Sequence, residues 1–351
     1  MRIAIVGGGF YGVMAALDAA KHKSVKEVVI YERDSKLLSG AAKLNQGRLH
    51  KGYHYPRSPE TIRQSLEGFD FYTRRFPNVI KQINNNIYVV RDDGLVPPDD
   101  YVRTMRSFNL SFSEIKLPET PLEYKSGGVN FIALKVEEQY IDFSILEPQL
   151  KRELGEARVK VELNSEVISI ESDEGVVETN DHCTSYDLVI NSTYENPFLG
   201  FENFPINLKY EMCIINLVSA PRLKDHAITI MDGGFVSVYP WQEGIHSFSS
   251  VIHTPAFKTN SLDSLNQFVK GWTEEDMASQ NSRINKHVDQ YLGFEYKSIG
   301  SFSVNKIKLL KDVGDSREVK TFRKGKCLAV IPGKLDAVTI FLKELNSQLG
   351  A

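Results

Sequence analysis

The sequence contains little cysteine and no long apolar run, and these two absences exclude several classes of protein. The chain has 351 residues but only three cysteines, Cys183, Cys213 and Cys327, whose wide spacing suits neither a disulfide framework nor a metal site. No apolar run reaches the roughly 20 residues that a transmembrane helix requires. Met1 leads directly into a predicted strand, which leaves no room for a signal peptide. We therefore expect a cytoplasmic protein with no bound metal and no membrane partner.

An excess of positive charge is missing as well. Lysine and arginine together number 42, against 45 aspartates and glutamates, which gives a formal net charge of −3. A chain with this balance has no overall basic field to attract nucleic acid or an anionic membrane, so we expect neither as a partner. With 42% apolar residues, the chain is long enough to bury a sizeable core and to form two domains. The composition leaves the oligomeric state open.

The start of the chain carries the most informative pattern. The apolar run before Gly7 predicts a buried strand of a parallel sheet, the Ala-rich segment after Gly12 predicts a helix, and the apolar run 28–31 predicts a second strand. Gly7, Gly9 and Gly12 fit the motif G-x-G-x-x-G at the junction of strand and helix. These glycines allow a tight turn, the close approach of a pyrophosphate to backbone N–H groups, and close packing of the helix on the strand. The order of these features indicates a dinucleotide site.

Residues beside this motif are candidates for further contacts with the dinucleotide. Glu32 lies 20 residues after Gly12, at the end of the second predicted strand, where a carboxylate accepts hydrogen bonds from a ribose hydroxyl. Phe10 and Tyr11 lie within the motif and Arg33 follows Glu32, so we count these three among the cofactor-binding candidates. The motif alone suits FAD or NAD(P), and it also suits a dinucleotide-binding module without catalytic activity.

The loop over residues 39–58 favours FAD. It is rich in Gly, Asn, His and Tyr, and it contains the pattern N-x-G-x-x-H-x-G-x-x-Y, formed by Asn45, Gly47, His50, Gly52 and Tyr55. With this pattern the chain resembles the FAD-dependent oxidoreductases of the D-amino-acid oxidase and glycine oxidase superfamily. It is similar in particular to the branch that contains 2-hydroxyglutarate dehydrogenase. The resemblance implies that this loop passes beside the flavin ring.

The same resemblance implies roles for individual residues of the loop. Asn45 and Gly47 are expected to contact the cofactor, His50 to face the flavin or the substrate, and Tyr55 to contact the substrate. An imidazole in that place is a candidate base for an alcohol substrate, so we name His50 as a catalytic candidate. The alternative is an ordinary loop histidine that is hydrogen-bonded to the backbone, and we favour that alternative for His54.

Two later segments continue the resemblance. A predicted helix over 143–154 leads to a strand-like run at 166–170, where the superfamily returns from the substrate domain to the FAD domain. The backbone of Val167 is expected there to contact the adenine side of FAD. The apolar run 186–191 resembles the strand that ends near the pyrophosphate. The family commonly has Ala-Gly after this strand, whereas residues 192–194 of this chain read Ser-Thr-Tyr.

The central segment is predicted to supply most of an antiparallel sheet on the substrate side. Its strand-like runs are 209–218, 234–241 and 246–253. Tyr239 and Trp241 are candidates for lining the substrate pocket. Both residues suit equally well the role of a sheet residue whose polar tip is hydrogen-bonded.

The C-terminal stretch again matches the superfamily. The run 326–331 predicts a buried strand, Pro332-Gly333-Lys334 a sharp turn, and 335–349 an amphipathic helix. The resemblance implies that the start of this helix faces the flavin, where free N–H groups stabilise negative charge on the reduced ring. Gly333 is therefore a cofactor-binding candidate. Lys334 is both a cofactor-binding and a catalytic candidate, because it adds a full positive charge.

Two arginines before this strand are candidates for binding a substrate carboxylate through a two-pronged guanidinium. They are Arg317 and Arg323, and the spacing does not choose between them. We carry Arg317 forward as the substrate-binding candidate.

Together these features predict an α/β protein with a Rossmann-type FAD-binding domain and an interleaved α+β substrate domain built on an antiparallel sheet. The expected boundaries are 1–80, 137–200 and 306–351 for the FAD-binding domain, and 81–136 and 201–305 for the substrate domain. The expected reaction oxidises a C–N or C–OH bond of a small amino acid, amine or hydroxy acid by hydride transfer to flavin N5. O2 or another electron acceptor then reoxidises the flavin. The alternatives are an NAD(P)-binding dehydrogenase and a non-catalytic dinucleotide-binding module.

Overall fold

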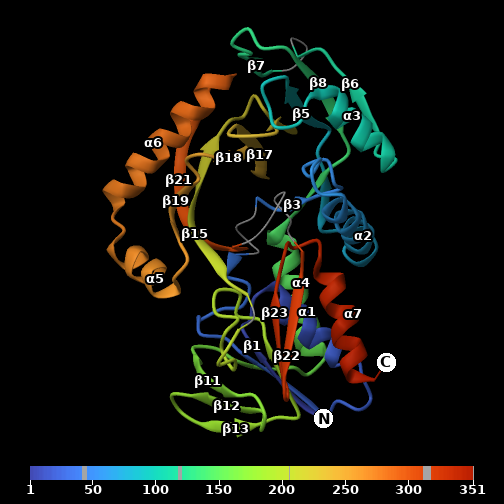
Figure 1. Ribbon diagram of the computed structural model, residues 1–351, viewed down its shortest axis with the longest axis vertical. Helices are drawn as coiled ribbons and strands as arrows, with labels where there is room; N and C mark the ends of the chain where they lie inside the picture. Colours follow the sequence, from blue (N-terminus) through green and yellow to red (C-terminus); the bar gives the residue numbers. More distant parts are fainter. Residues whose placement is uncertain (42–45, 118–120, 205, 311–317, 351) are drawn as a thin grey trace.

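Two β-sheets organise the molecule. The computed structural model describes residues 1–41, 46–117, 121–204, 206–310 and 318–350. A six-stranded sheet occupies the lower half of Figure 1 and a nine-stranded sheet the upper half. The chain passes between the two halves repeatedly, so segments distant in sequence contribute to each sheet. This architecture confirms the predicted α/β fold class, while the domain boundaries given above stay a prediction.

The six-stranded sheet places the glycine-rich turn at its edge. Its strand order is β10 (Lys160–Glu162), β2 (Glu27–Tyr31), β1 (Arg2–Val6), β14 (Leu188–Asn191), β23 (Cys327–Ile331) and β22 (Lys320–Lys324). All neighbours are parallel except β22, which pairs with β23 in the antiparallel sense. Because β2, β1 and β14 are parallel neighbours, their carboxyl ends open at one edge, where α/β proteins bind ligands.

Helices cover this sheet and complete its core. They are α1 (Phe10–Ala19), α4 (Phe143–Glu156) and α7 (Val338–Leu349), with α2 (Pro59–Arg75) beside α7 (Figure 1). Val13, Leu150 and Phe341 are fully buried where these helices meet the sheet. Burial of these apolar faces, rather than helix propensity alone, holds the helices in place.

The last helix starts later than the sequence indicates. We expected it from residue 335, but α7 begins at Val338. The preceding residues form a tighter turn, in which Ala337 N–H donates to Lys334 O at 3.3 Å and Val338 N–H to Leu335 O at 3.4 Å. Hydroxyl groups also hold these carbonyls, because Tyr11 donates to Lys334 O at 2.6 Å and Tyr72 to Leu335 O at 3.1 Å.

The nine-stranded sheet is antiparallel except at one place. Its order is β19 (Pro255–Thr259), β15 (Leu208–Ser219), β18 (Ile245–Ser250), β17 (Val236–Gln242), β16 (His226–Met231), β5 (Asn85–Arg91), β8 (Phe131–Val136) and β6 (Phe112–Glu114), and β21 (Lys297–Leu309) also pairs with β15. The exception is the pair β5 and β16, which is parallel and joins strands distant in the chain. The expected antiparallel sheet is therefore present, with one parallel pair that the sequence pattern did not reveal.

Smaller elements complete the molecule. Helices α5 (Leu262–Gly271) and α6 (Glu274–Tyr291) pack against the nine-stranded sheet, and α3 (Pro98–Ser107) packs beside β5. The short strands are β3 (Arg48–Leu49), β4 (Ile80–Gln82), β7 (Glu123–Tyr124), β9 (Gln139–Ile141), β11 (Val167–Glu171), β12 (Val176–Thr179), β13 (Cys183–Ser185) and β20 (Leu292–Gly293).

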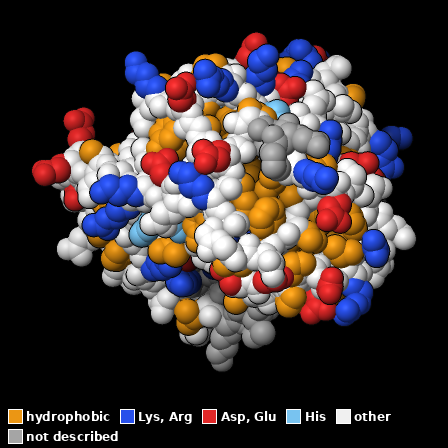
Figure 2. Space-filling view, turned by 90° about the horizontal axis from the view of Figure 1, so that it is seen from above, with side chains coloured by type: hydrophobic (Ala, Val, Ile, Leu, Met, Phe, Trp, Pro, Cys, Tyr) orange, Lys and Arg blue, Asp and Glu red, His pale blue; other side chains and the backbone are white. Residues whose placement is uncertain are grey.

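Seen from above, hydrophobic side chains gather near the centre of the upper face, with charged side chains around them (Figure 2). Within the described ranges, no helix has the length and apolar character needed to cross a bilayer.

Candidate active site

One cavity connects the two sheets. Its volume is about 570 Å³. Three groups of residues line it: the glycine-rich turn with the ends of β1 and β2, the loop that follows residue 46, and one face of the nine-stranded sheet. The C-terminal turn 332–335 closes one side. The cavity therefore brings together most of the segments that the sequence singled out.

The three motif glycines have different surroundings. Gly7 has φ +101°, and a Cβ there would lie 2.8 Å from Ser192 O. A Cβ at Gly12 would collide with Gly7 O, which fits a role in close packing. A Cβ at Gly9 would meet no protein atom within 4 Å, because it would project into the cavity. The first N–H groups of α1 have no acceptor within the helix, so Gly9 borders a space suited to a pyrophosphate.

The departure from the family pattern after β14 is compensated by hydrogen bonds. Ser192 Oγ lies 3.0 Å from both Val6 O and Gly7 O and donates to these carbonyls. The serine therefore ties the glycine-rich turn to the neighbouring strand. Tyr194 has φ +65°, a left-handed conformation that is uncommon for a side chain of this size. Its hydroxyl accepts from Ile307 N–H at 3.1 Å, and the residue lines the cavity.

The adenine end of the predicted site has the expected residues at the cavity wall. Glu32 is buried, and its carboxylate accepts from Gly8 N–H at 2.7 Å and from Asp34 N–H at 2.9 Å. Arg33 lies 3.5 Å from Glu195, and Val167 borders the same space. The backbone holds the Glu32 carboxylate in place, so its remaining lone pairs are available to a ribose. That role stays a prediction.

The loop after residue 46 supplies His50 and Tyr55 to the cavity. Asn45 lies outside the described residues. Gly47 does not line the cavity, although Gln46 and Arg48 on either side of it do. It has φ +60°, and a Cβ there would lie 2.8 Å from Ile141 O, so its observed role is in the turn. The likeness of this loop to that of 2-hydroxyglutarate dehydrogenase stays a prediction.

His50 and His54 differ in their surroundings. His50 is buried, and its Nδ1 lies 3.3 Å from a carboxylate oxygen of Glu138. Burial lowers the pKa of His50, and Glu138 offsets part of this shift. His54 also lines the cavity, contrary to our expectation of an ordinary loop residue, and its Nδ1 has no partner in the described part of the chain. Burial together with His50, Arg48 and Lys334 holds the pKa of His54 well below its usual value, so His54 is neutral.

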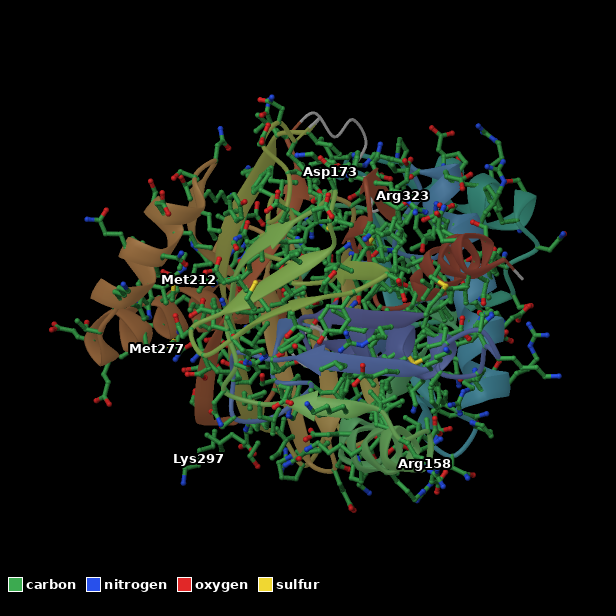
Figure 3. The ribbon with its side chains drawn as sticks, turned by 90° about the horizontal axis from the view of Figure 1, so that it is seen from below. Arg158, Asp173, Met212, Met277, Lys297 and Arg323 are labelled. Atoms are coloured by element: carbon green, nitrogen blue, oxygen red, sulfur yellow. The ribbon has the colours of Figure 1, made fainter. Side chains whose placement is uncertain are left out.

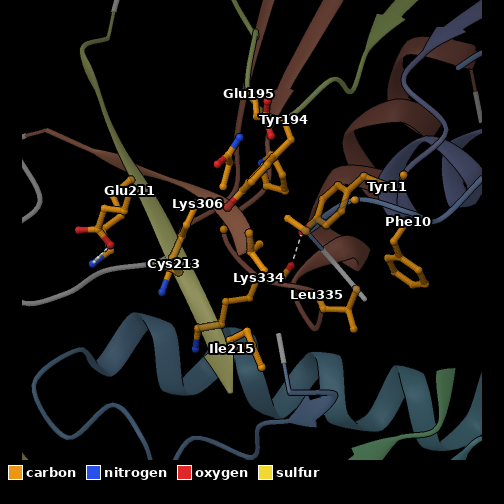
Figure 4. Close-up of a pocket in the computed structure, with 18 of the residues that line it drawn as sticks. Phe10, Tyr11, Tyr194, Glu195, Glu211, Cys213, Ile215, Lys306, Lys334 and Leu335 are labelled. Carbon is orange, nitrogen blue, oxygen red and sulfur yellow. Dashed lines mark hydrogen bonds and ion pairs between the residues drawn. The ribbon is translucent and has the colours of Figure 1, made fainter. Parts of the chain in front are cut away.

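Lys334 lies where the C-terminal turn meets the loop. Its Nζ is 2.8 Å from the centre of the Tyr55 ring and is shielded from solvent. Figure 4 shows Lys334 in the same pocket as Cys213 and Ile215 of β15 and Lys306 of β21. The predicted meeting of the loop and the C-terminal turn is therefore observed, although its relation to a flavin stays a prediction.

Sequence reasoning missed Arg48. This buried arginine lines the cavity, 5% exposed, and its Nε and Nη1 donate to Gln46 Oε1 at 3.0 Å and to Thr229 Oγ1 at 3.1 Å. The guanidinium lies 4.0 Å from the centre of the Tyr239 ring. Its Nη2 is buried with no hydrogen-bond partner, and no carboxylate of the described residues pairs with Arg48. The signal that the sequence offered for Arg48 was its place within the loop 39–58, beside the residues of the N-x-G-x-x-H-x-G-x-x-Y pattern.

The other substrate candidates lie elsewhere. Tyr239 is fully buried behind Arg48 and is not part of the cavity wall, and Trp241 packs against Phe302 with ring centres 5.5 Å apart. Arg317 lies outside the described residues. Arg323 is on the outer strand β22, where its Nε donates to Gly325 O (Figure 3). Among the substrate-binding candidates that the structure describes, Tyr55 alone lines the cavity.

Known proteins share this architecture. Glycine oxidase from Geobacillus kaustophilus superposes with a TM-score of 0.72 over 99% of this chain and 94% of its own, at 14% identity. L-alpha-glycerophosphate oxidase from Mycoplasma pneumoniae, solved with FAD bound, gives a TM-score of 0.72 over 100% of this chain and 94% of its own, also at 14% identity. At such identities the likeness shows the fold.

Sequence comparison is more specific. The chain is 27% identical to the FAD-dependent monooxygenase FPY4 of Fusarium mangiferae, over 96% of this chain and 88% of that protein. The family model described as FAD dependent oxidoreductase (DAO) matches residues 2–270. The glycine turn, with its open space at Gly9, fits the cofactor that this description names. The chain therefore belongs to the DAO family of FAD-dependent oxidoreductases, and FAD is its cofactor.

Proposed function

We propose that this enzyme oxidises the C–OH bond of a small anionic substrate, such as a hydroxy acid. The observation that supports this proposal most strongly is the buried Arg48, which lines the same cavity as His50 and whose Nη2 has no hydrogen-bond partner among the described residues. A buried cation without a counter-ion is unfavourable. A ligand that brings a negative charge would therefore bind with a favourable change in free energy. FAD, when bound, accepts the hydride, and O2 or another electron acceptor then takes the electrons.

The charges around this end of the cavity support an anionic ligand. Arg48 and Lys334 both carry positive charge there, and His54 is neutral because burial lowers its pKa. Glu138, the nearby carboxylate, is occupied by His50, Tyr88 and the backbone of Lys51. A substrate carboxylate would pair with the guanidinium of Arg48, which its hydrogen bonds to Gln46 and Thr229 hold in place.

His50 supports an alcohol rather than an amine. A hydroxyl must lose its proton when the carbon loses a hydride, and a buried neutral imidazole can accept that proton. Because burial lowers the pKa of His50, the ring is unprotonated at neutral pH and ready to act as a base. Lys334 would favour the negative charge that accompanies reduction of the cofactor.

Anaerobic bleaching of the flavin with panels of hydroxy acids, amino acids and their neutral amides tests this proposal. We expect hydroxy acids to bleach the wild-type flavin. Arg48→Met should raise KM for the acid by about 10- to 100-fold, as expected for loss of a hydrogen bond to a charged group, while KM for the amide changes little. Arg323→Met is the matched control, since Arg323 lies on the outer strand β22.

Three results would contradict the proposal. Bleaching by amino acids but not by hydroxy acids would assign the reaction to a C–N bond. Equal use of acid and amide by the wild type would remove the anion site. Because the relative FPY4 is named a monooxygenase, products are also analysed after reaction under ¹⁸O₂. Incorporation of the label would indicate oxygen insertion instead of dehydrogenation.

A further inference from the structure

Glu138 is a buried carboxylate in the turn between β8 and β9, and only 1% of it is exposed. Three groups approach it. Its Oε1 accepts from Lys51 N–H at 3.0 Å and lies 3.3 Å from His50 Nδ1, and its Oε2 accepts from the Tyr88 hydroxyl at 2.6 Å. Burial is unfavourable for a carboxylate unless its oxygens are satisfied, and these three groups satisfy both oxygens of Glu138.

We infer that Glu138 is a positioning residue that fixes the tautomer of His50 and stabilises the imidazolium formed when His50 takes the substrate proton. The inference rests on the function proposed above. It assigns to Glu138 a contribution to the reaction although this residue does not line the cavity.

The hydrogen-bond chemistry determines the tautomer. An ionised carboxylate can only accept, so a hydrogen bond to Glu138 requires a proton on His50 Nδ1. The other ring nitrogen, Nε2, is then unprotonated and able to accept a proton. Tyr88 cannot replace His50 in this role, because burial raises the pKa of its hydroxyl well above the usual value and the hydroxyl stays a donor.

The electrostatic surroundings make the carboxylate necessary. Burial lowers the pKa of His50, and Lys334 of the C-terminal turn lowers it further, while Glu138 and, to a smaller extent, Asp336 raise it. His54 of the same loop is neutral. Burial also raises the pKa of Glu138, but His50, Tyr88 and the Lys51 N–H outweigh this and hold it below its ordinary value. Glu138 is therefore negatively charged when the imidazolium forms, and it offsets both burial and Lys334.

The substrate carbon gives a hydride, with its electron pair, to the enzyme's FAD, and the substrate hydroxyl gives its proton to His50 Nε2. The C–O single bond becomes a carbonyl, and the proton leaves His50 for solvent after the product departs. Glu138 keeps its charge throughout and exchanges no proton.

Glu138→Gln is a sharp test, because a glutamine can preserve every contact while removing the charge. Its carbonyl can accept from Lys51 N–H and His50, and its amide can donate to the Tyr88 hydroxyl. We expect the rate of flavin reduction at saturating substrate to fall on the order of a hundredfold, with KM and FAD content little changed. The reduction rate falls at low pH, where His50 becomes protonated, and this acid limb of the pH–rate profile should move to lower pH, because loss of the Glu138 charge lowers the pKa of His50.

Tyr88→Phe is the matched control. It removes the other hydrogen bond to Glu138 but keeps the charge and the contact with His50, so its rate and acid limb should stay near those of the wild type. If Tyr88→Phe reproduced both changes of Glu138→Gln, the effect would belong to packing of the turn and the inference would be withdrawn.

A spectroscopic measurement on the wild-type holoenzyme needs no variant. ¹⁵N NMR of the imidazole, assigned with His50→Gln, should show a proton on Nδ1 and none on Nε2 at neutral pH. The opposite tautomer would overturn the inference even if Glu138→Gln failed to fold. A wild-type reduction rate in His50→Gln would instead remove the base of the proposed function. A slow His50→Gln beside a fast Glu138→Gln would remove only the role of Glu138.

Discussion

Arg48 and Arg91 are both buried arginines in strands, but they differ in what neutralises them. Arg91 donates from Nε and Nη2 to the carboxylate of Asp93 at 2.7 and 2.8 Å, so its charge is balanced within the protein. Within the described part of the chain, the groups that contact the Arg48 guanidinium are an amide, a hydroxyl and an aromatic ring. The sequence does not distinguish the two, because Thr229, one of the groups around Arg48, is 181 residues away. Of our sequence candidates for binding a carboxylate, Arg317 lies outside the described residues and stays a prediction, and Arg323 lies on β22 and does not line the cavity.

At the scale of single residues, the role of Glu32 is also testable. Glu32→Ala removes a carboxylate that accepts two backbone hydrogen bonds beside the cavity. If the same carboxylate also holds the ribose, FAD binding should weaken by about 1.5–3 kcal/mol, the usual value for hydrogen bonds to a charged group. The measurement is the flavin-to-protein absorbance ratio after purification, together with FAD titration of the apoprotein.

Glu27→Ala is the control for this variant. Glu27 lies at the start of β2, at the opposite end from Glu32, and it is half-buried and pairs with Arg2, so its loss should leave FAD content unchanged. Full FAD occupancy in Glu32→Ala would show that Glu32 stabilises only the glycine-rich turn.

At the scale of elements, different glycines of the glycine-rich turn are expected to serve folding and cofactor binding. A valine at position 9 meets no protein atom near its Cβ, whereas position 12 is blocked by the backbone of Gly7. Gly9→Val should therefore leave the thermal unfolding of the apoprotein nearly unchanged and abolish FAD binding, because the side chain fills the space next to the helix N-terminus. Gly12→Val should instead lower the unfolding temperature.

Unfolding of both variants, with and without added FAD, checks this prediction. A Gly9→Val protein that is stabilised by FAD as strongly as the wild type would show that the pyrophosphate lies elsewhere.

Elements also show where sequence patterns suffice and where they do not. The strands β1, β2, β14 and β23 are continuous apolar runs next to recognisable turns, so local pattern was enough to predict them. The parallel pairing of β5 with β16 was not predictable, because it joins residues 85–90 to 226–231 and no local signal encodes a partner so distant. The late start of α7 has a similar cause, since hydroxyls of Tyr11 and Tyr72 hold the carbonyls before it.

At the scale of the whole molecule, the cavity depends on the meeting of the two ends of the chain. The hydroxyl of Tyr11 donates to Lys334 O at 2.6 Å across 323 residues of sequence. Lys334 in turn lies over the ring of Tyr55, from the loop whose Gln46 and Arg48 donate hydrogen bonds to Ser247 and Thr229 of the nine-stranded sheet. Under the proposed function, a substrate held by Arg48 would lie in a cavity lined by both sheets, and water would be excluded from it only when the entire chain is folded.

This arrangement leads to a prediction for Lys334. If Lys334 faces the flavin as predicted, Lys334→Met removes a positive charge that would favour the reduced, anionic flavin over the oxidised form. The reduction potential should fall and flavin reduction should slow, while FAD binding stays largely intact because the pyrophosphate site is remote. Lys334 also lowers the pKa of His50, so the acid limb should move to higher pH, opposite to the shift expected for Glu138→Gln.

A redox titration and a single-turnover reduction rate, measured for both proteins across pH, check these expectations. Lys343→Met is the matched control, since Lys343 lies on α7 itself but is exposed and pairs with Glu67. An unmoved potential together with a shifted acid limb would show that Lys334 acts on His50 and the substrate side alone. An unmoved potential with an unmoved limb would mean that the C-terminal turn has no electrostatic part in the reaction. Its contact with Tyr11 would then serve only to hold α7 against α1, as part of the packing of the FAD-binding sheet.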